Sequence, residues 1–156
     1  MGVAGSGKTT VGRALAAELK WEYFEADDFH PPANVAKMSR GEPLDDADRA
    51  PWLAAIRRKI DERLGGGRTG VFTCSALKAA YRRVLLDRAA GIALVYLRGS
   101  PETIAQRVAS REGHFMKAEM VRSQFEALEP PEDALTIETR SSPVEIVACI
   151  RRHHGI

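Results

Sequence analysis

The residues G-V-A-G-S-G-K-T at positions 2–9 set the prediction for the whole chain of 156 residues. They match the pattern G-x-x-x-x-G-K-[ST] of a phosphate-binding loop, or P-loop, whose glycines let backbone N–H groups surround phosphate oxygens without Cβ clashes. An amphipathic stretch over residues 8–19 follows at once, with Val11, Leu15 and Leu19 on one face. A glycine-rich turn that only caps a helix is the alternative interpretation. A full match directly before a clear helix favours the P-loop.

A P-loop predicts a site for ATP and Mg²⁺. The helix that it opens points its positive N-terminal end at the phosphates and adds to the charge of Lys8, while the hydroxyl of Thr9 is placed to bind Mg²⁺. These roles follow from the charge of the phosphates and from each residue's place in the motif. The nucleotide-binding residues predicted from the loop are Gly2, Gly5, Ser6, Gly7, Lys8, Thr9 and Thr10.

Beyond the P-loop, stretches with an apolar period near two alternate with stretches whose period is near 3.6. This alternation is typical of βαβ units, and it predicts an α/β fold in which helices flank a parallel sheet, the three-layer sandwich of P-loop NTPases. Two helices are expected to begin at Ser100-Pro101 and Ser142-Pro143, where an N-cap residue precedes a proline. The other predicted elements are strands at residues 21–26, 70–74, 92–97 and 134–139, and helices at residues 45–64 and 79–88.

The strand that normally precedes a P-loop is missing from this pattern. It is usually the central strand of the sheet and needs about five or six residues, yet only Met1 precedes Gly2. We therefore expect the first, central strand to be truncated. If the chain is complete, the sheet is expected to be split or rearranged at its centre.

Composition indicates a single domain over residues 1–156 that works in the cytoplasm. Hydrophobic residues make up 44% and charged residues 28% of the chain, and the net charge is only +2. Without a block of one charge, no nucleic-acid or membrane partner is predicted. No apolar run approaches the roughly 18 residues of a membrane span, and no signal peptide is recognisable. Cys74 and Cys149 lie far apart and suggest a reducing compartment.

A carboxylate site is predicted where the strand at 21–26 runs into Glu25-Ala26-Asp27-Asp28. In a doubly wound sheet this strand end lies beside the P-loop, where an acceptor hydroxyl would bind. We assign Asp27 as the base or orienting group for that hydroxyl, and as a ligand that reaches Mg²⁺ through water. The alternative is that Asp27 or Asp28 caps the helix that follows Pro31 and Pro32.

An arginine-bearing lid is predicted over residues 107–126. Arg107 and Arg111 are four residues apart on one helix face and precede Gly113, a possible hinge. Such arginines neutralise charge on the transferred phosphoryl group, and lid closure excludes water. Arg107 is also the residue expected to stack on adenine, with the loop at 140–143 beside it. A solvated helix face with ordinary ion pairs is the alternative.

These features favour a small-metabolite kinase among P-loop proteins, because the N-K-x-D string of GTPases is absent and the chain is short for most motor folds. The chain also resembles the gluconokinase family over most of its length. The family pattern D-[GA]-D-x-x-H-P is met at residues 25–31, except that Glu25 replaces the first aspartate. The family block K-M-x-x-G-x-P-L-x-D-x-D-R-x-P-W-L is met at residues 37–53. Further matches are Cys74-Ser75-Ala76-Leu77-Lys78, Tyr81-Arg82, Arg111 and Gly113-His114-Phe115.

The resemblance implies transfer of the γ-phosphoryl group of MgATP to the 6-hydroxyl of D-gluconate, by a homodimer with a shikimate-kinase-like fold. The departure at Glu25 leaves Asp27 as the better-supported base. Gluconate is a linear polyol with a carboxylate, so its site needs a cation and several hydrogen-bonding groups. The alternative for each cation is ordinary charge on a helix surface. The predicted substrate-binding residues are His30, Arg49, Lys78, Arg82 and His114, and the predicted catalytic residues are Lys8, Asp27 and Arg111.

Two other functions stay open at this point. A shikimate-kinase-like enzyme for another small acid would need a glycine-rich loop directly after the strand at 70–74, whereas Gly65-Gly66-Gly67 precedes that strand. A nucleotide-binding regulatory module without turnover would bind ATP but release no ADP in response to gluconate.

Overall fold

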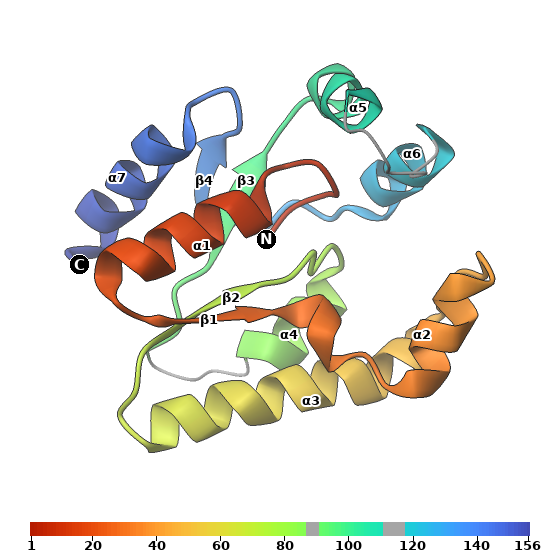
Figure 1. Cartoon of the computed structure of the whole chain (residues 1–156), viewed down its shortest axis with the longest axis horizontal. Helices are drawn as coiled ribbons and strands as arrows, with labels where there is room; N and C mark the ends of the chain where they lie inside the picture. Colours follow the sequence, from red (N-terminus) through yellow and green to blue (C-terminus); the bar gives the residue numbers. More distant parts are fainter. Residues whose placement is uncertain (87–90, 111–117) are drawn as a thin grey trace.

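Each strand is separated from the next by one or more helices, as the sequence predicts (Figure 1). The computed structural model describes residues 1–86, 91–110 and 118–156. In chain order the elements are α1 (Lys8–Leu19), β1 (Glu22–Glu25), the 3-10 helix η1 (Ala26–Phe29), α2 (Pro32–Ser39), α3 (Asp46–Gly65), β2 (Gly70–Thr73), α4 (Ala79–Leu86), β3 (Val95–Arg98), α5 (Pro101–Ala109), α6 (Ala118–Ala127), β4 (Leu135–Glu138) and α7 (Pro143–His154).

The described strands form two parallel pairs rather than one continuous sheet. β1 pairs with β2 in a register that places Glu25 opposite Thr73. β3 pairs with β4, and Val95 lies opposite Leu135. The expectation of a sheet split at its centre is therefore confirmed for the described residues.

The first two residues connect the two pairs of strands. The backbone nitrogen of Met1 donates to the carbonyl oxygen of Val95 at 2.5 Å, and the Met1 carbonyl accepts from Leu97 N at 3.0 Å. On the other side, Gly2 N donates to the carbonyl oxygen of Ser75 at 3.2 Å. The P-loop thus starts between the carboxyl ends of β2 and β3, the edge at which α/β proteins bind ligands.

Helices pack on both faces of the strands, α1 and α7 on one side and α3 and α4 on the other (Figure 1). Alternate residues of β2 face opposite ways, so Val71 packs against the α1 and α7 core and Phe72 against the α3 and α4 core. A third cluster places Val3 of the P-loop against Ile104 and Val108 of α5. The three-layer arrangement follows from apolar residues on both faces of the strands.

Most predicted element boundaries agree with the structure. α1 covers the predicted residues 8–19, and the N-caps Ser100 and Ser142 begin α5 and α7 as expected. The strand predicted at 92–97 is shorter and begins at Val95, because pairing with β4 starts there. The last two residues of the helix predicted at 79–88 lie outside the described residues. No described helix combines the length and the apolar character needed to cross a bilayer.

Candidate active site

The P-loop wraps around the N-terminus of α1. Gly7 is the N-cap of the helix, in the left-handed conformation with φ 91°, which glycine adopts without strain. Gly5 packs so closely on α5 that a Cβ atom there would lie 2.8 Å from Val108 Cγ2. The Nζ atom of Lys8 donates to the carbonyl oxygen of Val3 at 3.0 Å across the loop. The conformation of the loop therefore depends on glycine at positions 5 and 7.

A cavity of about 270 Å³ opens beside this loop. Its lining brings Arg107, at the end of α5, together with the P-loop and with Thr139 to Pro143, the turn before α7. Arg107 also donates to the carbonyl oxygen of Thr139 and so ties α5 to this turn. Ser141 and Pro143, in the loop at 140–143 that is predicted to border adenine, line the cavity, and the contact with adenine stays a prediction. The predicted nucleotide residues in the lining are Gly5, Ser6, Gly7, Thr10 and Arg107.

Glu25 at the end of β1 connects the P-loop to the neighbouring strand. Its carboxylate accepts hydrogen bonds from the hydroxyls of Thr9 at 2.9 Å, Tyr23 at 2.5 Å and Thr73 at 2.7 Å. Burial alone would raise the pKa of Glu25, but the bonds from Tyr23, Thr73 and Thr9, with the charge of Lys8, lower it below its ordinary value. Glu25 is thus ionised at neutral pH beside the predicted Mg²⁺ ligand.

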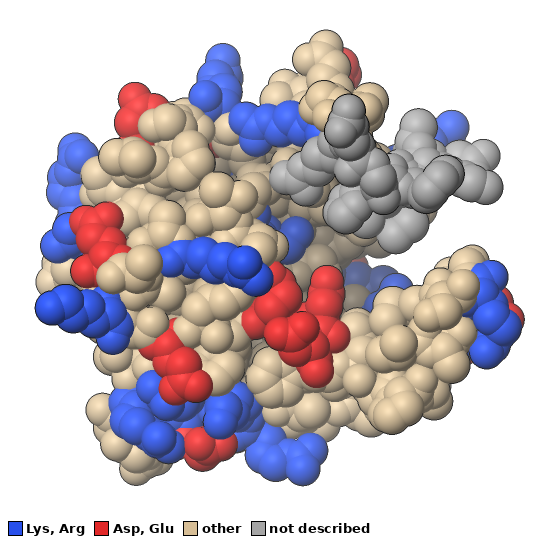
Figure 2. Space-filling view, in the orientation of Figure 1, with Lys and Arg blue, Asp and Glu red and all other residues tan. Residues whose placement is uncertain are grey.

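Asp27 lies two residues further on, exposed in η1. The alternative role predicted for Asp27 and Asp28, as caps of the next helix, is wrong, because Pro31 is the N-cap of α2 and no side chain of the described residues caps it. Figure 2 shows acidic side chains gathered over the end of β1 and η1. Negative charge at this place suits a site for a cation.

His30 follows η1 and stacks on Trp52 of α3, with ring centroids 4.5 Å apart. Burial lowers the pKa of His30, Asp27 raises it in part, and Arg49 lowers it further. The imidazole is therefore neutral at pH 7. Its Nδ1 atom lies 3.4 Å from the amide nitrogen of Asn34, a buried residue of α2. His30 is held in place by packing and retains polar atoms for a ligand.

Two predicted substrate cations meet at Asp46, the first residue of α3. Lys78 Nζ lies 2.9 Å and 3.0 Å from the two carboxylate oxygens of Asp46, and Arg49 Nη1 lies 4.0 Å from one of them. The hydroxyl of Tyr81 also donates to Asp46, and both cations lie over the Tyr81 ring. The structure thus brings α3 and the start of α4 together around Arg49 and Lys78.

Arg82 has a different environment from the other predicted substrate cations. It is buried, and its Nη1 atom donates to the carbonyl oxygens of Ala76 at 3.0 Å and Leu77 at 2.9 Å. This atom holds the turn after β2 in place, and Ala76 in that turn has a positive φ of 45°. The role of Arg82 toward substrate stays a prediction. Arg111 and His114 lie outside the described residues.

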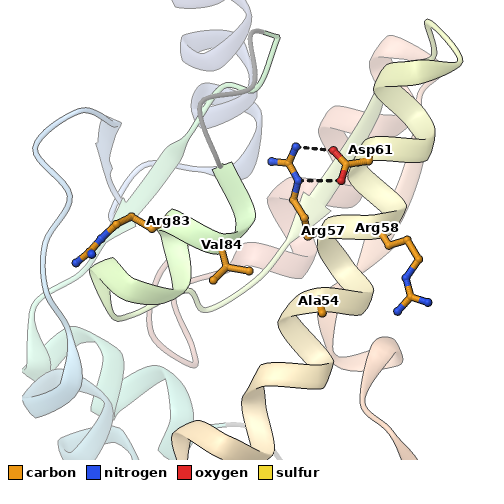
Figure 3. A pocket seen from close by; sticks show the side chains of 6 residues that line it. All are labelled: Ala54, Arg57, Arg58, Asp61, Arg83 and Val84. Carbon is orange, nitrogen blue, oxygen red and sulfur yellow. Dashed lines mark hydrogen bonds and ion pairs between the residues drawn. The ribbon is translucent and has the colours of Figure 1, made fainter.

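A second hollow, of about 570 Å³, lies between α3 and α4 (Figure 3). Arg57 and Asp61 point toward each other on α3, and Arg57 also donates to the carbonyl oxygen of Leu85 in α4 at 3.0 Å. Arg58 and Arg83 extend in opposite directions and do not converge on one point. The described residues that line this hollow therefore lack the arrangement of a binding site.

Sequence reasoning missed two residues that organise the site, Glu25 and Asp46. Glu25 was set aside because it departs from the family's aspartate, although its place at a strand end after a P-loop was a usable signal. Asp46 lies in the matched block at residues 37–53, but nothing local indicated that Lys78 and Tyr81, more than 30 residues away, would contact it.

Comparisons with known proteins give the family and the fold of the chain. A family model described as an AAA domain matches residues 1–131. The chain is 50% identical over 133 residues to the gluconokinase of Gluconobacter oxydans (strain 621H). The matched region covers 85% of this chain and 75% of that relative. A solved sugar kinase from Janibacter sp. HTCC2649 is 41% identical, with a TM-score of 0.87 over 97% of this chain and 90% of that one. A gluconokinase structure from Sinorhizobium meliloti 1021 is 43% identical, with a TM-score of 0.82 over 95% and 85%. The predicted α/β fold of P-loop kinases is confirmed.

Proposed function

The chain belongs to the gluconokinase family of P-loop kinases, and on that premise we propose that it transfers the γ-phosphoryl group of MgATP to the 6-hydroxyl of D-gluconate. The observation that carries the proposal is the 2.9 Å hydrogen bond from Thr9 to Glu25. It joins the P-loop to the strand end that leads into Asp27, so the phosphate cradle and the acceptor residues share one edge of the fold.

The P-loop residues fit a nucleotide phosphate with its metal ion. Gly5 and Ser6 line the cavity, and the buried hydroxyl of Ser6 has no hydrogen-bond partner among the described residues. We assign Lys8 to the phosphate charge and Thr9 to Mg²⁺. When bound, Mg²⁺ neutralises charge on the phosphate oxygens. No described group of three or more His, Cys, Asp or Glu side chains forms a metal site.

Asp27 is proposed to accept the proton of the 6-hydroxyl. As the bond from O6 to the γ-phosphorus forms, the bond from that phosphorus to the bridging oxygen breaks and ADP leaves. A carboxylate within hydrogen-bond reach gives the hydroxyl proton a destination as its oxygen becomes positive. Asp27 is exposed in η1, directly after the end of β1, which supports this role.

Recognition of D-gluconate is assigned to the residues around Asp46 and Trp52. We propose that Arg49 or Lys78 pairs with the gluconate carboxylate, while neutral His30 exchanges hydrogen bonds with its hydroxyls. Asp46 positions Arg49 and Lys78, and it competes with the substrate carboxylate for them. Arg82 and His114 complete the proposed substrate set. On the ATP side, Arg107 is proposed to contact adenine and, with Arg111 and the lid at 107–126, to act on the phosphates.

A coupled assay of ADP release tests the function. Purified chain is given MgATP with D-gluconate, shikimate or related sugar acids, one at a time. We expect turnover with D-gluconate and little with shikimate. Turnover with another acid alone would make the chain a related kinase of that acid. ATP binding without ADP release on any acceptor would instead favour a regulatory module.

The remaining proposals concern the surroundings of the enzyme. We propose a cytoplasmic homodimer that binds neither nucleic acid nor membrane. Support comes from the near-neutral net charge of +2 and from the family resemblance. Light scattering of the purified chain over a range of concentrations tests the homodimer, and a mass of a single chain throughout would reject it.

A further inference from the structure

Hydroxyl groups from three elements converge on the carboxylate of Glu25. Thr9 comes from the first turn of α1, Tyr23 from the same strand as Glu25, and Thr73 from the end of β2. Thr9 and Tyr23 both donate to Oε2, whereas Thr73 donates to Oε1. The Tyr23 and Thr73 hydroxyl oxygens are themselves 2.7 Å apart. Tyr23 and Thr73 carry no role in the function proposed above.

The number of protons in this network determines how Thr9 is oriented. Each of the three hydroxyls has one proton, and the Glu25 carboxylate oxygens are the acceptors in all three hydrogen bonds. The single proton of Thr9 is therefore used by Glu25, and the lone pairs of Thr9 Oγ1 are left for another partner. A hydroxyl bound to Mg²⁺ needs this arrangement, because it must present a lone pair and not a proton to the cation.

The packing beneath α1 holds the network in place. Gly12 lies one turn after Thr9, and a Cβ atom there would lie 2.5 Å from Thr73 Cγ2 and 3.0 Å from Tyr23 Cε2. The helix can therefore rest directly on Tyr23 and Thr73 only because residue 12 has no side chain. This contact sets the distance between the helix that carries Thr9 and the strands that carry Glu25.

We propose that Tyr23 and Thr73 are positioning residues for phosphoryl transfer, which hold Glu25 so that it takes the Thr9 proton and leaves the Thr9 oxygen free to bind Mg²⁺. The inference rests on the proposed function for its nucleotide and metal, but not for its acceptor. Glu25 acts through Thr9, so its neighbours affect how much Mg²⁺ strengthens nucleotide binding. They should not affect how the P-loop holds phosphate without metal.

Calorimetric titration with ADP, in the presence of Mg²⁺ and in EDTA, separates these two effects. We expect Tyr23→Phe and Thr73→Val to leave the metal-free Kd within about twofold and to weaken MgADP binding by about tenfold, the lower range for residues that support a metal ligand. Glu25→Gln should show the larger loss. Thr73→Ser keeps the hydroxyl and should restore MgADP binding. Tyr96→Phe, a buried tyrosine of β3, is the matched control and should match wild type.

Circular dichroism and the melting temperature of each variant show whether it folds. The inference is overturned if Tyr23→Phe and Thr73→Val bind MgADP like wild type. It is also overturned if they weaken ADP equally with and without Mg²⁺, since that would mean a merely structural role. Because the titration uses no gluconate, a chain that fails to phosphorylate gluconate but shows the Mg²⁺-specific loss rejects the proposed acceptor and keeps this inference.

Discussion

Asp27 and Glu25 are two residues apart on the chain but lie in different environments. Glu25 is partly buried and accepts three hydroxyl hydrogen bonds, so its oxygens are occupied and its charge is stabilised. Asp27 is exposed in η1 and follows the strand end. A base must keep an oxygen free to accept the substrate proton. A carboxylate that positions another residue instead uses its oxygens for hydrogen bonds. The two environments therefore suit two different roles.

Replacing Asp27 by asparagine should lower kcat for D-gluconate by about 10²- to 10⁴-fold, the usual contribution of a general base. The affinity for MgATP should stay near that of wild type, because the P-loop is unchanged. Asp28→Asn is the matched control, since Asp28 is the next exposed residue of the same 3-10 helix. Steady-state kinetics measure kcat, and ATP titration measures the affinity for MgATP. Unchanged kcat in Asp27→Asn, or an equal loss in Asp28→Asn, would contradict the base assignment.

The reactivity of Cys74, which directly follows β2, tests how far its thiol is buried. Burial raises the pKa of its thiol to about 11. The thiolate is the reactive form, so at pH 8 only about one thiol in a thousand would be ionised. In a Cys149→Ser background, reaction with a thiol reagent at pH 8 should be at least about 100-fold slower in the native protein than in denaturant. The rate should rise as the pH approaches 11, and a native rate close to the unfolded one would contradict this environment.

At the scale of elements, local signals set where helices begin. The capping box of α7 pairs the Ser142 hydroxyl with Glu145 N at 3.3 Å, and the Glu145 carboxylate with Ser142 N at 2.7 Å. Asp45 and Asp48 form the same reciprocal pair at the start of α3. Both motifs can be recognised along a single stretch of chain, since their partners are three residues apart.

Ser142→Ala should lower the free energy of unfolding by about 1 kcal/mol, because one backbone N–H at the start of α7 loses its partner. Chemical denaturation monitored by circular dichroism measures the change. Ser39→Ala is a suitable control, since that exposed hydroxyl only bonds back to the Val35 carbonyl within α2. A loss no larger than that of Ser39→Ala would mean that the cap contributes little in this helix.

For the whole molecule, the question is whether the two strand pairs unfold together. β2 contributes Val71 to the core beneath α1 and α7, and Phe72 to the core beneath α3 and α4. Met1 also forms hydrogen bonds with β3, and Gly2 forms one with Ser75 after β2. These contacts predict one cooperative transition although the described strands do not form a continuous sheet.

Ile56→Ala and Ile146→Ala test this cooperativity by removing one buried side chain from each core. Each should cost about 2–5 kcal/mol, as usual for a buried isoleucine. In a Trp21→Phe background, the fluorescence of Trp52, in the α3 and α4 core, and the far-UV circular dichroism should move together in both variants. If Ile146→Ala shifts the circular dichroism transition but not the tryptophan transition, the two halves unfold separately.

The sequence by itself determined the P-loop, the helix that follows it, the N-caps of α5 and α7, and the family. These features depend on residues within a few positions of one another, where motif spacing, periodicity and capping can be recognised directly. The roles predicted for Arg111 and His114 stay predictions. Only the tertiary structure decided that Glu25 reaches Thr9 and Thr73, that Asp46 collects Arg49 and Lys78, and that one atom of Arg82 supports a turn. The reason is physical: Glu25 and Thr73 are 48 residues apart, and only the register of β1 against β2 and the packing of α1 bring their oxygens within 2.7 Å.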